Sequence, residues 1–142
     1  MWMDDEVSEY AYEKCLTNDK KEFWSLIIDS EWAYMYCQII EDREEVRKYI
    51  TDSEWAYFYC ENIIDDPNVR KYIVNSEYAC KYCRFIKDRL EIRKYITDSE
   101  WAYQYCRLIK DRPEIRKLIT DPQWSDMYCK YIKKRTRGIN NT

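Results

Sequence analysis

The sequence predicts an all-α fold, an α-solenoid of about six helix-turn-helix repeats of 23 residues, and three observations lead to it. The motif Ser-Glu-Trp-Ala-Tyr-x-Tyr-Cys recurs with that period in full and looser copies over residues 30–37, 53–60, 76–83, 99–106 and 122–129, and a first copy, one residue shorter overall, occupies 8–15. Apolar residues inside each copy follow helical spacing. One Gly and three Pro, with 46% hydrophobic and 36% charged residues, fit a folded helical chain. Such a period is typical of stacked repeats that cannot bury their apolar sides alone.

The first helix of each repeat is predicted over 98–109 and the equivalent ranges. Asp98 is a good N-cap, because its carboxylate can accept a hydrogen bond from a free amide of the first turn. The equivalent positions are also competent caps: Asp29, Asp52, Asn75 and Asp121. One helical face carries the apolar set Trp101, Ala102, Tyr105, Cys106 and Ile109. This face should be buried between repeats.

The second helix is predicted to start at Asp111, because Asp111 and Glu114 match a capping box. The same pattern recurs at Asp19 with Glu22, Asp42 with Glu45 and Asp88 with Glu91, while Asp65 keeps only the cap. Pro67 and Pro113 fall in the first turn, where proline is tolerated. Ile115, Leu118 and Ile119 form a short apolar stripe. A helix of about two turns must pack against the first helix and the next repeat.

We expect one repeat domain over 1–142. It consists of an N-terminal capping repeat (1–29), four central repeats (30–121), and a degenerate C-terminal repeat with a basic tail (122–142) that is predicted to be frayed. No apolar run approaches the length of about 18 residues that a membrane span needs. The acidic start after Met1-Trp2-Met3 does not resemble a signal peptide. We therefore expect a cytoplasmic protein with no membrane contact.

Seven cysteines and no histidine raise the question of a metal site. Equivalent cysteines in stacked repeats should lie about 8 to 10 Å apart, too far for a disulfide or a tetrahedral zinc site. We therefore expect core packing, with Cys80-x-x-Cys83 as a weak redox or metal candidate. Without histidine the commonest general base is missing, and Gly138 alone cannot make a phosphate loop. The sequence predicts no enzyme, no cofactor and no metal.

The opposite side of the first helix varies between repeats, and we expect it to face solvent and a partner. The predicted partner-binding residues are Met35, Phe58, Lys81, Gln104, Met127, Arg84, Arg107 and Lys130. Met35, Phe58 and Met127 are apolar where the geometry predicts solvent, which indicates either a contact patch or unconstrained variation.

Charge is divided unevenly along the chain. Residues 1–66 hold 18 acids and 6 bases, a net charge of −12, and residues 67–142 hold 9 acids and 18 bases, a net charge of +9. A basic patch is predicted from Lys87, Arg89, Lys110, Arg112, Lys133, Lys134, Arg135 and Arg137. A second basic series consists of Arg47-Lys48, Arg70-Lys71, Arg93-Lys94 and Arg116-Lys117. Because these pairs end the second helices, the helix dipole explains most of this series, and phosphate binding is the alternative.

The unit S-E-W-A-Y-x-Y-C-x-x-I-x-D-R-P-E-I-R-K-x-I resembles the short tandem helical repeats of largely uncharacterised proteins from bacteriophages, large viruses and bacteria. The resemblance covers residues 8 to 132 and departs at Cys, where the relatives usually carry Ala, and at the Arg-Lys pair. It implies an α-helical repeat fold and a viral origin, hence a host-directed or anti-defence binder in the host cytoplasm.

Three functions follow as hypotheses. The leading one is a protein-protein interaction module. The alternatives are a nucleic-acid-binding protein that uses the basic C-terminal half, and a structural subunit that self-associates head to tail through its opposite charges. The first is favoured because the aromatic residues are predicted in the core, where they cannot stack on bases.

Overall fold

The computed structural model is all-helical and describes residues 2–133, which fall in two compact units that meet between residues 73 and 74 of the sequence. The fold class is therefore confirmed as all-α, whereas the continuous solenoid and the single domain remain predictions. Unit 1 contains α1 (Asp4–Thr17), α2 (Lys21–Trp24), α3 (Ser30–Ile39), α4 (Glu44–Arg47), α5 (Ser53–Asn62) and α6 (Pro67–Arg70). Unit 2 contains α7 (Ser76–Phe85), α8 (Leu90–Arg93), α9 (Ser99–Leu108), α10 (Pro113–Arg116), α11 (Pro122–Tyr128) and the π-helical turn η1 (Cys129–Lys133).

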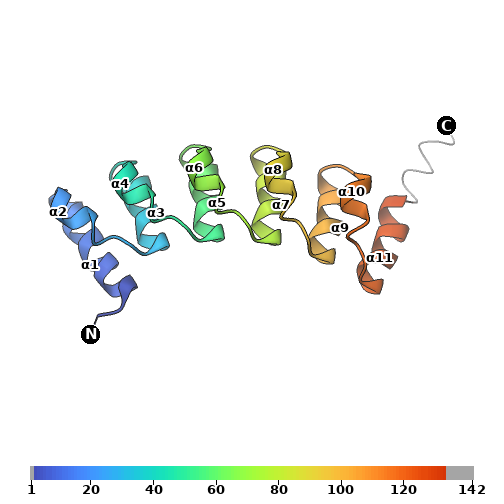
Figure 1. Ribbon diagram of the computed structural model, residues 1–142, viewed down its shortest axis with the longest axis horizontal. Coiled ribbons are helices and arrows are strands. Elements are labelled where there is room, and N and C mark those ends of the chain that lie inside the picture. The colour runs from blue at the N-terminus through green and yellow to red at the C-terminus, as the bar shows by residue number, and fades with distance from the viewer. Residues whose placement is uncertain (1, 134–142) are drawn as a thin grey trace. The chain divides into compact units, whose positions relative to one another are not determined.

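Long and short helices alternate, and each described short helix lies beside the long helix before it (Figure 1). Within unit 1, α1 packs on α3 and α3 packs on α5. Within unit 2, α7 packs on α9 and α9 packs on α11. Each unit is thus built from stacked helix pairs.

The long helices start where the sequence predicts. The side chains of Asp29, Asp52, Asn75, Asp98 and Asp121 accept hydrogen bonds from amides of the first turn. The central long helices have 10 residues, two fewer than the predicted range 98–109, because the chain leaves the helix at the position of Ile109.

The short helices begin one residue later than predicted. Arg43, Arg89 and Arg112 are the N-caps of α4, α8 and α10, and none of their side chains caps the helix. Asp66, rather than Asp65, caps α6. One α-turn is followed by a tighter turn, in which the amide of Ile50 donates to the carbonyl of Arg47 at 2.9 Å. The capping-box interpretation of the second helix was therefore wrong.

The recurring Asp instead joins neighbouring repeats. The Tyr36 hydroxyl donates to Asp19 at 2.8 Å, and Arg43 Nε donates to Tyr36 at 2.8 Å. Unit 2 repeats this network with the equivalent residues: the hydroxyl of Tyr105 donates to Asp88 at 2.6 Å, and Arg112 Nε donates to that hydroxyl at 2.7 Å. Because these groups are largely withdrawn from water, each carboxylate ties two consecutive long helices together.

The recurring Ser closes each helix pair. In α9, the Ser99 hydroxyl donates to the carbonyl of Leu118 at 3.2 Å and accepts from the amides of Thr120 and Asp121, both at 3.1 Å. Ser8 and Ser30 bind the turns after α2 and α4 in the same way. One hydroxyl thereby satisfies the backbone at the exit of each short helix.

The core is aromatic, as the sequence predicts, but the burial of three recurring residues differs, and one of them is Ile109, which was assigned to the apolar face and is only half-buried. The first Tyr of the motif is buried, as at Tyr103 with 1% exposure, although it was not assigned to the apolar face. The Trp of the motif was assigned to that face, yet Trp101 is only half-buried. Trp residues lie at the edge between repeats, where Trp124 packs on Tyr103 with 5.4 Å between ring centroids. This position leaves one side of the indole accessible to solvent.

Candidate functional site

The outward side of the long helices holds the varying residues that we predicted to bind a partner. Five of them, expected in solvent, are half-buried: Met35, Phe58, Lys81, Gln104 and Met127. Contacts with neighbouring side chains make Phe58 and Lys81 less exposed than expected. Phe58 packs 6.3 Å from Tyr34 and 5.6 Å from Trp55. Lys81 pairs with Glu77 at 3.3 Å. Arg84, Arg107 and Lys130 are exposed as predicted.

Two of these predicted residues line one groove in unit 2. Arg107 and Met127 come together there with Tyr103 and Tyr131, around a volume of about 410 Å³. Tyr103 and Arg107 belong to α9, Met127 to α11 and Tyr131 to η1. Sequence analysis missed Tyr103 and Tyr131, although Tyr131 stands one helical turn after Met127. We refer to these four residues as the α9–α11 groove.

Exposed cations recur along unit 2, and two of them are at the α9–α11 groove: Arg107 lines it, and Lys130 lies over the ring of Tyr131 at 5.4 Å. At or just after the end of each long helix of unit 2 stand two exposed basic residues three positions apart: Arg84 and Lys87, Arg107 and Lys110, Lys130 and Lys133. Within residues 2–133, none of these six side chains forms a salt bridge. These charges therefore leave a positive potential on unit 2 that no salt bridge among the described residues neutralises.

Other members of the predicted basic patch are bound within the fold. Arg89 Nε donates to the Tyr82 hydroxyl at 2.8 Å. Arg112 contacts Tyr105 and Asp88. Arg89 is therefore engaged by a tyrosine hydroxyl and Arg112 by the Asp–Tyr–Arg network, so the fold already uses these two members of the predicted patch. Lys134, Arg135 and Arg137, together with the predicted frayed tail, lie outside the described residues.

In the second basic series, the arginines form contacts within the fold and the lysines are exposed. Its arginines lie near the recurring aspartates, as in Arg93 with Asp88 at 3.1 Å and Arg116 with Asp111 at 3.0 Å. Its lysines are exposed: Lys48, Lys71, Lys94 and Lys117. A phosphate backbone would thus meet one cation per repeat instead of two, which weakens this alternative.

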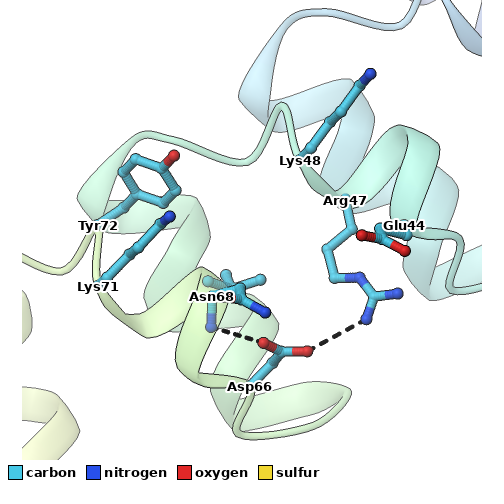
Figure 2. A pocket seen from close by; sticks show the side chains of 8 residues that line it. Glu44, Arg47, Lys48, Asp66, Asn68, Lys71 and Tyr72 are labelled. Carbon is cyan, nitrogen blue, oxygen red and sulfur yellow. Dashed lines mark hydrogen bonds and ion pairs between the residues drawn. The ribbon is translucent and has the colours of Figure 1, made fainter.

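A second groove lies in unit 1 along α4 and α6, with a volume of about 310 Å³ (Figure 2). Arg47 and Asp66 point toward one another across it at 3.2 Å, and the amide of Asn68 donates to Asp66 at 2.7 Å. Asp66 occupies the position that Arg43, Arg89 and Arg112 hold elsewhere. Arg47 and Asp66 thus pair with each other in this groove, whereas Lys48 and Lys71 are exposed at it.

The cysteines resemble core residues more than reactive ones. Six are buried, and burial raises the pKa of Cys83 to about 12 and that of Cys80 to about 11. Both thiols are therefore protonated at neutral pH and are poor nucleophiles. Cys129 is exposed, contrary to the prediction that every recurring thiol is buried, because no described short helix covers it. Residues 2–133 contain no group of three or more Cys, Asp or Glu side chains suited to a metal ion.

No helix among residues 2–133 has both the length and the hydrophobicity to cross a bilayer. Comparison of the chain with protein-family models, with curated proteins and with solved structures gives no match. Function must therefore be inferred from the chain itself.

Proposed function

We propose that this chain is a non-enzymatic protein-protein interaction module that binds its partner on the outward side of the long helices of unit 2. The supporting observation is the α9–α11 groove, where an apolar floor is bordered by exposed, unpaired cations. Interfaces combine such an apolar centre with a polar rim. The recurring side chains are used to hold repeats together, which leaves the varying positions free to contact a partner.

The non-enzymatic part of the proposal rests on the available chemistry. The chain has no histidine. Burial raises the pKa of Cys37, Cys60 and Cys106 to about 12, which removes the thiolate that nucleophilic catalysis needs. Asp19 and Asp88 are engaged with tyrosine and arginine partners. Each of these groups has a role in stability that accounts for its position.

Nucleic-acid binding is the second candidate, and the six exposed cations of unit 2 favour it. Two observations make it the weaker one. In each arginine–lysine pair at the ends of the short helices, the arginine is bound to an aspartate and the exposed lysine is left for binding. The aromatic side chains next to the cations already have a ring face covered, as by Arg84 over Phe85 at 4.7 Å and Lys130 over Tyr131 at 5.4 Å. Bases would have to displace these cations before they could stack.

The third candidate, head-to-tail self-assembly, has less support because both end repeats depart from the stacking pattern. Lys14 stands at the position of Tyr36, whose hydroxyl binds the preceding repeat, and Asp126 stands at the position of Tyr103, on which the next Trp packs. A further copy stacked at either end would lose these contacts. Terminal repeats that differ in this way are typical of capped arrays.

The place of action is also part of the proposal. Seven free cysteines fit a reducing compartment such as the cytoplasm. The resemblance to phage and viral repeats supports a host-directed or anti-defence role for the binder, in the cytoplasm of the host.

The test is affinity capture from a lysate, with and without nuclease, using the wild-type chain and two charge-reversal variants. Arg107→Glu with Lys130→Glu changes the border of the groove, and Lys94→Glu with Lys117→Glu makes the same charge change on the short helices. We expect a stoichiometric protein that survives nuclease, is lost with the first variant and is retained with the second. Recovery that disappears with nuclease would instead support nucleic-acid binding.

A further inference from the structure

The α9–α11 groove is open in unit 2, whereas the equivalent position between α3 and α5 of unit 1 is filled. There, Phe58 replaces Met127 and packs 6.3 Å from Tyr34, the equivalent of Tyr103. Asn62 replaces Tyr131 and donates to the Tyr34 hydroxyl at 2.9 Å.

In unit 2, Tyr103 keeps its ring against Trp124, but its hydroxyl has no hydrogen-bond partner within residues 2–133. Met127 is half-buried and Tyr131 is 46% exposed. The groove volume of about 410 Å³ lies within the range of about 300 to 1,000 Å³ typical of small-molecule sites, so it can hold one large side chain.

The charges around the two equivalent positions also differ. In unit 2, the outward positions near the ends of the long helices carry Arg84, Lys87, Arg107, Lys110, Lys130 and Lys133. At the α3–α5 position of unit 1, the equivalents of the last four, Arg107, Lys110, Lys130 and Lys133, are Gln38, Glu41, Glu61 and Ile64. The cations are therefore concentrated on the unit that has the open groove. Their charge favours a ligand that carries negative groups beside the part that enters the groove.

We propose that the α9–α11 groove holds one aromatic or large aliphatic side chain of an acidic protein segment, whose flanking carboxylates pair with Arg107 and Lys130. This inference rests on the proposed function and specifies the chemistry of its partner. An extended or helical segment with a single apolar anchor between acidic residues matches the groove. A nucleic-acid strand matches the cations but finds the ring of Tyr131 already covered by Lys130.

The test uses three labelled probes in a fluorescence anisotropy titration of the full chain. The first is a short peptide of glutamates with one central Phe, the second is the same peptide with Ala in place of Phe, and the third is a single-stranded oligothymidylate. We expect the Phe peptide to bind about tenfold more tightly than the Ala peptide, because one apolar side chain becomes buried. Tighter binding of the oligothymidylate than of the Phe peptide would overturn the proposal.

A matched variant closes the groove with side chains that the fold already accepts at this position. Met127→Phe with Tyr131→Asn introduces the residues found at Phe58 and Asn62, and it leaves all six cations in place. We expect the variant to keep its helical circular dichroism and its affinity for the Ala peptide, but to lose the preference for Phe. A preference that persists in the folded variant would show that the anchor binds elsewhere and would overturn the assignment.

Failure of the inferred apolar anchor can be separated from failure of the proposed function. If the capture experiment recovers a nuclease-resistant protein that depends on Arg107 and Lys130, while the Phe preference is absent, the module binds protein without the anchor that we infer. If the capture experiment recovers no such protein, the proposed function itself fails.

Discussion

Removing the hydroxyl of Tyr105 should destabilise the protein strongly, whereas removing that of Tyr103 should not. Both side chains are buried in α9, with 0% and 1% exposure, so a change to Phe removes no packing volume in either case. The Tyr105 hydroxyl donates to Asp88 at 2.6 Å and accepts from Arg112 at 2.7 Å, whereas the Tyr103 hydroxyl has no partner among residues 2–133.

Hydrogen bonds to charged groups contribute about 1.5 to 3 kcal/mol each. Asp88 keeps Arg93 and Arg112 as partners after the change and retains 22% side-chain exposure, so water compensates part of the loss. We therefore expect Tyr105→Phe to cost about 2 kcal/mol, or about 6 °C in Tm. Tyr103→Phe should change the free energy of unfolding by less than about 0.5 kcal/mol.

Thermal and urea unfolding followed by far-ultraviolet circular dichroism measures both variants. Equal losses for the two variants would refute the reasoning, because the network would then add nothing beyond burial of the ring. A double variant of Tyr105→Phe with Asp88→Asn should lose less than the sum of its single changes, since the two groups share one network.

Three further predictions concern the Ser99 hydroxyl, the Asp88 carboxylate and the cysteine thiols. Ser99→Ala should lower the free energy of unfolding by about 2 kcal/mol, because it leaves the amides of Thr120 and Asp121 without their acceptor. The loss is measured from the urea midpoint of this variant, with Ser25→Ala at an exposed position as the control. The pKa of Asp88 is lowered by its hydrogen bond from Tyr105 and by the charge of Arg93, against the effect of burial. Its stabilisation is therefore present above the unfolded pKa of about 3.9 and is lost as pH falls through the folded pKa, so Tm should drop below about pH 4, and less steeply in Asp88→Asn. A thiol reagent should label Cys129 at once and the buried cysteines only after unfolding, and fast labelling of a second thiol would contradict their burial.

The starts of the long helices could be predicted from the sequence because their signals are local. Asp98 caps α9 by reaching amides two and three residues later, and Pro122 occupies the first turn of α11. Hydrophobic spacing likewise placed Ala102 and Cys106 in the core. These features depend on neighbours within one helical turn.

The contacts between repeats could not be derived in the same way. Asp111 followed by Glu114 satisfies a capping pattern, so nothing local indicated that Asp111 binds Tyr128 in the next long helix. The available signal was the joint recurrence of an Asp, a Tyr 17 residues later and an Arg 24 residues later, as in Asp19, Tyr36 and Arg43. A pattern of that length points to a contact between repeats.

The groove depends on side-chain volume and so required the structure. Met127 and Phe58 occupy the same position and are both apolar, yet the groove is open beside the first and filled beside the second. Sequence analysis identified Arg107 and Met127 as members of a varying surface. It did not show that Tyr131 and Tyr103 complete a concave site with them.

The central claim is that the outward side of the long helices in unit 2 contacts a protein, and site-specific photo-crosslinking tests it most directly. A benzophenone amino acid at position 107 lies at the border of the α9–α11 groove, and the same group at position 94 lies on a short helix as the control. We predict a crosslinked product at position 107 that resists nuclease, is digested by protease and is absent at position 94. Crosslinking that is equal at the two positions, or a product that nuclease removes, would contradict the account.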